Sequence, residues 1–291
     1  MTLISERAPA KINLTLEVLG RRADGYHELR SLVAFAPDAA DLVTLDVTRP
    51  AGCDVTGPFG GSIAGQNLIE LTLAKLSQMD ARLQLGHVSL TKNLPVAAGI
   101  GGGSADAAAV LRAVIRANPN RADLDLGRLA LSIGSDVPVC MESRLSWMTG
   151  IGDGVIPADR NSSEPMYAVI ANPRVPVPAD KTAQVYRALS APPLAPDTNA
   201  QLPALAQQST ELLSYMARTQ NALQPAALKI VPEITVVLDE LAGLPGAMLT
   251  RMSGGGPTCF ALFETLEAAK RAAADLSTRR PAWWIAASEL A

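Results

Sequence analysis

The residues best suited to chemistry form a glycine-rich segment between Pro95 and Ala107. Four of the five positions from Gly99 to Gly103 are glycine, so the backbone can approach a ligand closely and direct several N–H groups toward it. A helix is predicted from Ser104, and its positive dipole end favours an anion. The pattern predicts a phosphate-binding loop. The alternative is a tight structural turn, which so many glycines directly before a helix disfavour.

Two common nucleotide loops do not fit this segment. A Walker A loop ends in Gly-Lys-Ser or Gly-Lys-Thr, and the segment contains no lysine. A dinucleotide-binding fingerprint needs a third glycine where Ser104 stands. A Rossmann oxidoreductase is therefore the weakest of the functional alternatives.

Two charged residues outside the loop are candidates for chemistry. Asp136 lies between Gly134 and Pro138, and the proline predicts an extended loop at residues 135–138. Its carboxylate could serve as a general base or simply cap a turn, and the residues alone leave both open. Lys11 begins a predicted strand in an apolar stretch and shares a strand face with Asn13. The alternative for Lys11 is an ordinary solvated surface charge.

Composition narrows the class of protein. The 291 residues are 48% hydrophobic and carry a formal net charge of −3, without the basic block expected of a nucleic-acid partner. No run of about 18 apolar residues predicts a membrane span. Three distant cysteines and two histidines predict neither a disulfide framework nor a zinc site. We expect a cytoplasmic protein that handles small molecules, with no membrane association.

The elements predicted to position these residues alternate irregularly, which indicates an α+β fold with mixed sheets and helices. Polar, proline-containing residues 155–165 predict a boundary between domains 1–156 and 157–291. Strands are predicted at residues 12–18, 26–35, 42–47, 88–94, 167–171, 248–251, 258–263 and 283–287. Helices are predicted at residues 67–79, 104–117, 126–133, 210–217, 222–229, 233–241 and 266–276.

The glycine-rich segment resembles the phosphate-binding motif of the GHMP small-molecule kinases. Four further motifs of these kinases occur in the expected order, so the resemblance covers nearly the whole chain. They are Ala8–Leu14, Asp24–Leu29, Ser135–Pro138 and Met252–Cys259. The resemblance implies a two-domain GHMP kinase fold, an active site in the cleft between the domains, and no obligate protein partner.

The resemblance also implies roles for individual residues. ATP would lie over the loop with Mg²⁺, whose ligands stay unassigned. Asp136 would be the catalytic base, Lys11 would orient it and the reacting hydroxyl, and Asn13 would contact the substrate. The residues implied in ATP binding are Pro95, Ala98, Gly99, Gly101, Gly102, Gly103 and Ser104.

The substrate is implied by a second group of residues. Tyr26 would stack on a cytosine base and His27 would hydrogen-bond its edge, with Tyr186 on the other face of the base. Gly255 and Thr258 would contact a diphosphate. The predicted substrate is therefore a small molecule with a cytidine diphosphate moiety, phosphorylated on a hydroxyl. Without the resemblance, the three rings are equally ordinary strand or helix-core aromatics.

Other readings stay open at this point. A kinase of the same superfamily could act on mevalonate or homoserine, which need no base pocket. A non-catalytic nucleotide-binding protein could share the scaffold, although Lys11 and Asp136 argue against it. Some positions depart from the family pattern: Ala105 stands where a second serine is common, Gly255 and Pro257 replace serine and alanine, and Ala222 replaces aspartate.

Overall fold

The chain folds into two compact units that interleave along the sequence. Unit 1 comprises residues 1–10, 39–96 and 101–143, and unit 2 comprises residues 11–38, 97–100 and 144–291. The computed structural model describes residues 3–63, 67–121, 124–158, 165–196, 198, 202–203 and 209–291. The predicted domain boundary near residue 156 stays a prediction, as does an active site between the domains. Residues 159–164 of the predicted boundary lie outside the described residues.

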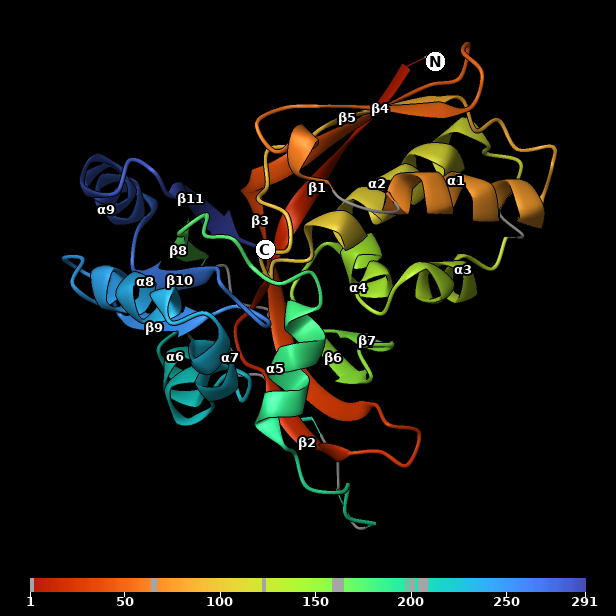
Figure 1. The fold of residues 1–291 in the computed structure, drawn as a ribbon. Coiled ribbons are helices and arrows are strands. Elements are labelled where there is room, and N and C mark those ends of the chain that lie inside the picture. The colour runs from red at the N-terminus through yellow and green to blue at the C-terminus, as the bar shows by residue number, and fades with distance from the viewer. Residues whose placement is uncertain are drawn as a thin grey trace. The chain divides into compact units, whose positions relative to one another are not determined.

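Unit 1 combines a small sheet with a group of helices. Strand β5 (His87–Thr91) pairs antiparallel with residues 42–46 of β3 (His27–Asp46) and parallel with β4 (Gly52–Thr56). Strand β1 (Leu3–Asn13), which also pairs with β3, contributes its first residues. Helix α2 packs against α1, and Figure 1 shows the two side by side. The helices are α1 (Leu68–Met79), α2 (Gly102–Ala117), α3 (Leu126–Ile133) and α4 (Val137–Glu142), with a 3-10 turn at Gly60–Ser62.

Unit 2 contains two groups of strands. The first half of β3 pairs antiparallel with β2 (Glu17–Arg21) and β6 (Ser146–Gly150), and β7 (Gly154–Pro157) pairs with β6. A separate antiparallel sheet has the order β11-β8-β10-β9. Its strands are β8 (Met166–Asn172), β9 (Leu249–Met252), β10 (Cys259–Phe263) and β11 (Trp284–Leu290).

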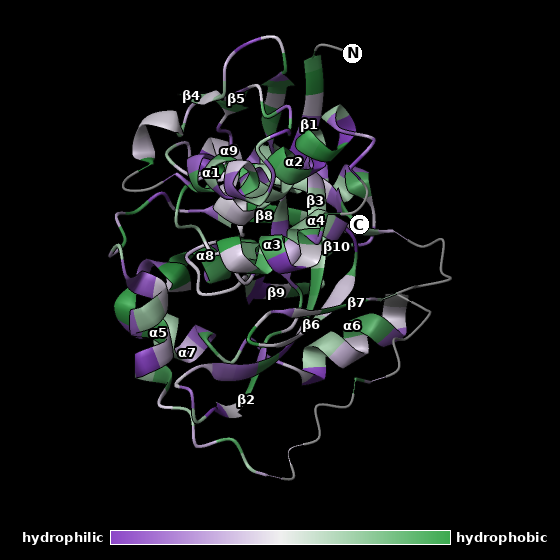
Figure 2. Cartoon of the chain, turned by 90° about the vertical axis from the view of Figure 1, so that its right-hand side faces the viewer, coloured by the Kyte–Doolittle hydropathy of each residue, from purple (hydrophilic) through white to green (hydrophobic). Residues whose placement is uncertain are grey.

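Helices cover the second sheet and form the core of unit 2 with it. Helices α8 (Glu233–Ala242) and α9 (Leu266–Arg279) pack against β8 and β10, so that Phe263 and Leu276 share one buried apolar cluster. Hydrophobic and hydrophilic residues both occur along α5 (Lys181–Leu189), as expected of a helix with one buried face (Figure 2). The remaining helices are α6 (Ser209–Arg218) and α7 (Gln224–Ile230).

The α+β prediction with mixed sheets is confirmed, and the predicted helices all form within three residues of their expected bounds. The strand predicted at residues 12–18 is wrong. Strand β1 ends at Asn13, and every residue from Ala8 to Leu16 is buried rather than alternately exposed. The polar members of the alternation are buried because they hydrogen-bond: the Asn13 amide donates to Ser31 Oγ, and Thr15 Oγ1 accepts from the N–H of Leu32.

The extended loop predicted at residues 135–138 is also wrong. Helix α4 begins at Val137, and Asp136 has helical dihedral angles, with φ −85° and ψ −11°. Proline is tolerated in the first turn of a helix because its missing N–H would have no intrahelical acceptor there. Pro138 therefore marks the start of a helix rather than excluding one.

Candidate active site

The glycine-rich segment leads directly into α2, as predicted, and the helix begins two residues earlier, at Gly102. The first N–H groups of the helix, those of Gly102 to Ser104, have no acceptor within the helix, which leaves them for a ligand. The residue before the helix, Gly101, has a φ of +64°, and Gly99 has a φ of +78°. Ala97 also has a positive φ, +54°, which costs a residue with a Cβ on the order of 1 kcal/mol.

The carbonyl groups of residues 97–100 all point toward other residues of unit 2. Each oxygen accepts a hydrogen bond from a residue distant in sequence. The donors to the four oxygens are, in order, Lys181 Nζ at 2.8 Å, Thr258 N at 3.2 Å, Ser253 Oγ at 3.2 Å and Lys11 N at 2.9 Å. Because C=O and N–H point in opposite directions across a trans peptide, the N–H groups of residues 98–101 are turned away from these partners.

The second glycine cluster, Gly254–Gly256, packs backbone against backbone on this segment. A Cβ at Gly99 would lie 2.7 Å from the oxygen of Gly256, and one at Gly254 would lie 2.6 Å from the oxygen of Gly99. Both glycines are therefore required by close packing. Gly255 differs, because the nearest atom to a Cβ there is Thr182 Oγ1 at 4.0 Å. A ligand could approach Gly255 more readily than its two neighbours.

The residues around the second glycine cluster are held in place by buried polar side chains. The Asn221 amide donates to the oxygens of Met252 and Gly254, both at 2.8 Å. Thr258 is fully buried, and its Oγ1 accepts a hydrogen bond from Asn172 at 2.8 Å. The Thr258 backbone thus supports the glycine-rich segment, whereas its assignment as a diphosphate ligand stays a prediction.

Lys11 and Asn13 are both buried, so Lys11 is not the solvated surface charge that the sequence left open. Lys11 is 4% exposed, and its Nζ lies 3.9 Å from Met148 Sδ. The Asn13 amide nitrogen donates to Ser31 Oγ, while its Oδ1 is buried without a hydrogen-bond partner. A buried amide oxygen in this state is a natural acceptor for a ligand hydroxyl.

Asp136 occupies the N-cap position of α4, but its side chain makes no capping hydrogen bond to that helix. It is partly exposed, and the capping role that the sequence left open therefore lacks support. Asp136 belongs to unit 1 and Lys11 to unit 2. Their joint action stays a prediction.

The structure brings two of the three predicted base-pocket residues together. The rings of His27 and Tyr186 stack with centroids 4.8 Å apart and an interplanar angle of 27°. Burial, assisted by nearby Arg21, lowers the pKa of His27, so its imidazole is neutral at pH 7. A neutral imidazole offers one donor and one acceptor, as the edge of a base requires. Tyr26, the third of these residues, is 60% exposed.

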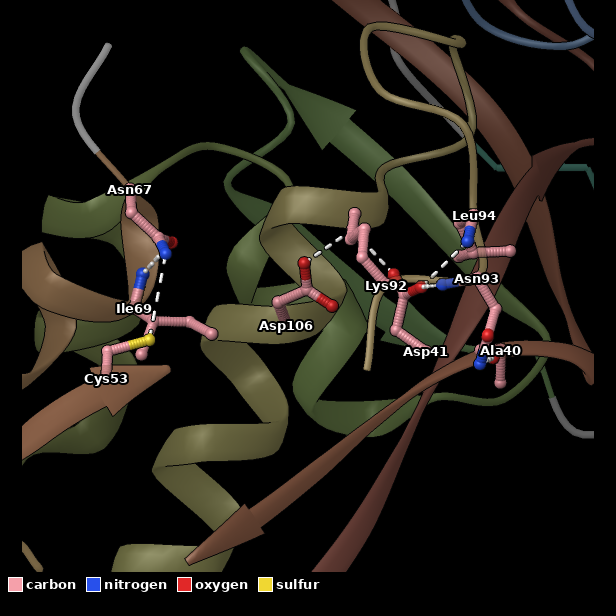
Figure 3. Close-up of polar contacts among 9 residues, drawn as sticks. All are labelled: Ala40, Asp41, Cys53, Asn67, Ile69, Lys92, Asn93, Leu94 and Asp106. Atoms are coloured by element: carbon pink, nitrogen blue, oxygen red, sulfur yellow. Dashed lines mark hydrogen bonds and ion pairs between the residues drawn. The ribbon is translucent and has the colours of Figure 1, made fainter. Parts of the chain in front are cut away.

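Unit 1 contains a buried charge cluster that the sequence did not predict (Figure 3). Lys92 Nζ lies 2.5 Å from Asp41 Oδ2 and 2.5 Å from Asp106 Oδ2. Asp41 Oδ1 also accepts the backbone N–H groups of Asn93 and Leu94. The cluster thus joins the chain just before Pro95 to the first turns of α2.

Two carboxylates share one ammonium group in this cluster, so the negative charges outnumber the positive one and the pKa values are shifted. Burial raises the pKa of Asp106 well above its usual range, against the opposing effect of Lys92 and with a further contribution from Asp41. Burial acts to lower the pKa of Lys92, but the two carboxylates outweigh it and raise that pKa. Asp106 Oδ1 is buried without a hydrogen-bond partner.

The cysteines of the core carry no sign of catalytic use. Cys140 and Cys259 are buried, and burial raises the pKa of the Cys259 thiol, so they behave as small apolar residues rather than as nucleophiles. Within the described ranges, no three His, Cys, Asp or Glu side chains are grouped so as to hold a metal ion. In that same part of the chain, no helix combines the length and apolar character needed to cross a bilayer.

The fold and the two glycine clusters define the class of protein. Residues 67–144 match the family described as GHMP kinases N terminal domain, and residues 201–281 match GHMP kinases C terminal. The chain is a small-molecule kinase of the GHMP class. A homoserine kinase from Cytophaga hutchinsonii has the same fold, with a TM-score of 0.68 over 99% of this chain and 95% of that one, at 18% identity.

More similar proteins specify the family. A 4-diphosphocytidyl-2-C-methyl-D-erythritol kinase of Methylobacterium radiotolerans is 46% identical over 98% of both chains. A crystal structure of a 4-(cytidine 5'-diphospho)-2C-methyl-D-erythritol kinase has a TM-score of 0.75 and 33% identity, covering 99% of each chain. This chain belongs to the family of 4-diphosphocytidyl-2-C-methyl-D-erythritol kinases.

The raised pKa of Asp106 predicts how stability depends on pH. The folded state binds a proton that the unfolded state releases above the usual carboxyl pKa, so the free energy of unfolding falls as pH rises. Asp106→Asn keeps an oxygen for Lys92 and removes the titration. We expect its free energy of unfolding, measured in urea between about pH 5 and pH 8, to fall less with pH than that of the wild type.

Asp239→Asn provides the control for this measurement, since Asp239 is exposed on α8. It should keep the wild-type dependence on pH. A wild-type slope in Asp106→Asn would contradict the raised pKa.

Proposed function

We propose that this chain transfers the γ-phosphoryl group of ATP to the 2-hydroxyl of 4-diphosphocytidyl-2-C-methyl-D-erythritol. The products are the 2-phosphate and ADP, and the step belongs to non-mevalonate isoprenoid biosynthesis. The observation that carries the proposal is that the carbonyl oxygens of residues 97–100 are all hydrogen-bonded within unit 2, which leaves the N–H groups of the loop for phosphates in a chain of this kinase family. The cytoplasmic location of the protein stays a prediction.

ATP binds, in this proposal, through backbone donors rather than through a Walker lysine. The N–H groups of residues 98–101 lie opposite their bound carbonyls, and those of Gly102 to Ser104 open the helix α2. Such donors are fixed before the ligand arrives, so little reorganisation opposes binding of the phosphates. Pro95 has no N–H and ends the extended approach to the loop.

Asp136 accepts the proton of the attacking hydroxyl in this mechanism. Its carboxylate is partly exposed and makes no capping hydrogen bond to α4. Lys11 supplies a buried positive charge that orients the hydroxyl and the carboxylate. Phosphoryl transfer needs alignment and charge neutralisation more than covalent help, which two such residues can provide.

ATP is expected to bring Mg²⁺, which neutralises charge on the transferred phosphate. Mg²⁺ in kinases is held largely by phosphate oxygens and water with one or two protein ligands, so a three-residue cluster is not required. Ser104, in the first turn of α2, has a hydroxyl that fits such a single contact. Ala105 has none, so the serine pair common in the family is reduced to one residue here.

The substrate pocket is proposed on the neutral ring of His27 and on Asn13. His27 reads the cytosine edge with its donor and acceptor, while Tyr26 and Tyr186 supply ring surface for stacking. The unsatisfied Asn13 Oδ1 accepts from a hydroxyl of the polyol. Gly255, where a Cβ would meet nothing closer than 4.0 Å, leaves room for the diphosphate.

A comparison of alcohols tests the proposed substrate. ADP release is measured with the purified chain, ATP and Mg²⁺, and with cytidine-diphospho-methylerythritol, mevalonate or homoserine as acceptor. We expect turnover with the first alone, because only it can use the stacked His27 and Tyr186 pair. Turnover only with mevalonate or homoserine would overturn the assignment, and ATP binding without any turnover would favour a non-catalytic protein.

Asp136→Asn tests the general base. We expect kcat to fall by about 10² or more, with the Kd for ATP nearly unchanged, because the amide cannot accept the proton. Asp239→Asn, an exposed position on α8, should retain wild-type kcat. Near wild-type turnover in Asp136→Asn would sink the assignment.

Gly103→Ala tests the contact between the loop and phosphate. A Cβ at this position would lie 3.3 Å from Leu68 Cδ1, the end of a flexible side chain, so the fold can accommodate it. We expect the KM for ATP to rise by roughly tenfold or more, since the methyl group occupies space beside the phosphates. Thermal unfolding should be close to wild type, and an unchanged KM for ATP would refute the contact at Gly103.

A further inference from the structure

A buried lysine at the start of α5 joins the two glycine-rich segments of unit 2. Lys181 is 3% exposed, and its Nζ donates to the oxygens of Ala97 and Gly256. The two acceptors are distant in sequence and belong to the two clusters that pack on each other. Neither cluster can therefore move at this point without breaking a hydrogen bond to Lys181.

The position is an unfavourable one for a lysine. Among the residues that the structure describes, its hydrogen-bond partners are carbonyl oxygens, and no carboxylate pairs with it. Burial lowers the pKa of Lys181 to about 8. A cation in the first turn of a helix also opposes the helix dipole. An apolar side chain would fill this space at lower cost, so stability alone does not explain an ammonium group here.

The two carbonyls differ in what lies on the other side of their peptide groups. The peptide after Ala97 carries the N–H of Ala98, which must point away from Lys181. The peptide after Gly256 leads to Pro257, which has no N–H. Lys181 therefore fixes the direction of a donor only in the Pro95–Ala107 loop, and it does so beside Ala97, whose φ is +54°.

We infer that Lys181 is a positioning residue for ATP, which holds the Ala97–Ala98 peptide in the orientation that presents the Ala98 N–H to a phosphate. This inference rests on the proposed role of the loop in ATP binding. Lys181 does not itself touch the nucleotide in this arrangement. Its second bond, to Gly256, anchors the ammonium so that the Ala97 carbonyl cannot rotate with it.

Lys181→Met tests the inference, because methionine has a similar length and no donor. We expect the Kd for ATP, measured by calorimetry with ATP and Mg²⁺ and without the alcohol, to rise roughly tenfold, which corresponds to about 1.4 kcal/mol. The KM for ATP should rise in parallel, whereas kcat and the KM for the alcohol should change less than about threefold. Lys181→Arg, which keeps N–H donors, should recover part of the affinity.

The control is Lys229→Met, because Lys229 is exposed on α7, and it should match the wild type in every measurement. Thermal unfolding of Lys181→Met should be at or above the wild-type temperature, since a buried charge is removed. An unchanged Kd for ATP in a folded Lys181→Met would overturn the inference, as would equal losses for ATP and alcohol. If Lys181→Met does not fold, Lys181→Gln decides in its place, because an amide cannot bond both carbonyls as the ammonium does. A raised Kd for ATP with an unchanged KM for the alcohol supports the inference, and an unchanged Kd for ATP overturns it.

Because calorimetry omits the alcohol, this result is separate from the substrate assignment. Failure of the alcohol comparison with a weakened Kd in Lys181→Met would remove the proposed substrate and leave the positioning role in place.

Discussion

The direction of a few peptide groups is the constraint on which the proposed nucleotide site depends. Glycine-rich backbone has no preferred direction of its own, because glycine populates both signs of φ. In unit 2 the direction is set from outside the loop, by donors on Lys11, Lys181, Ser253 and Thr258. The glycines let a ligand approach the backbone closely, and these four distant residues fix the direction of its peptide groups.

Unit 1 uses charge for the same purpose. Asp41 binds the chain before Pro95 through two N–H groups, and Lys92 carries the connection to Asp106 on α2. Buried ion pairs contribute little net stability, because desolvation offsets their attraction. Their geometry is nevertheless specific, since a carboxylate left without its ammonium would be strongly unfavourable. The segments on either side of the glycines are therefore fixed by groups that resist rearrangement.

Sequence predicted the parts of this molecule that depend on local rules. The helix after the loop, helix α1 and the α+β fold class all follow from propensity and periodicity. Contacts between distant residues could not be predicted in this way. Lys181 and Asp41 looked like ordinary charged residues, because nothing near them in sequence indicates their partners. The half-exposed strand predicted at residues 12–18 was wrong for a related reason. Polar residues that are buried in hydrogen-bonded pairs give the same alternating pattern as an exposed strand face.

The interleaving of the two units has a consequence for the newly made chain. Unit 1 is complete once residue 143 has left the ribosome, but residues 11–38 of unit 2 must wait for partners made much later, such as Ala291, which exchanges backbone hydrogen bonds with Phe35. During synthesis the first half of β3 therefore lacks β6 while its second half can already pair with β5. One strand is finished at two different times, and the edge of its early half that waits for β6 is open to chaperones and to aggregation in the nascent chain.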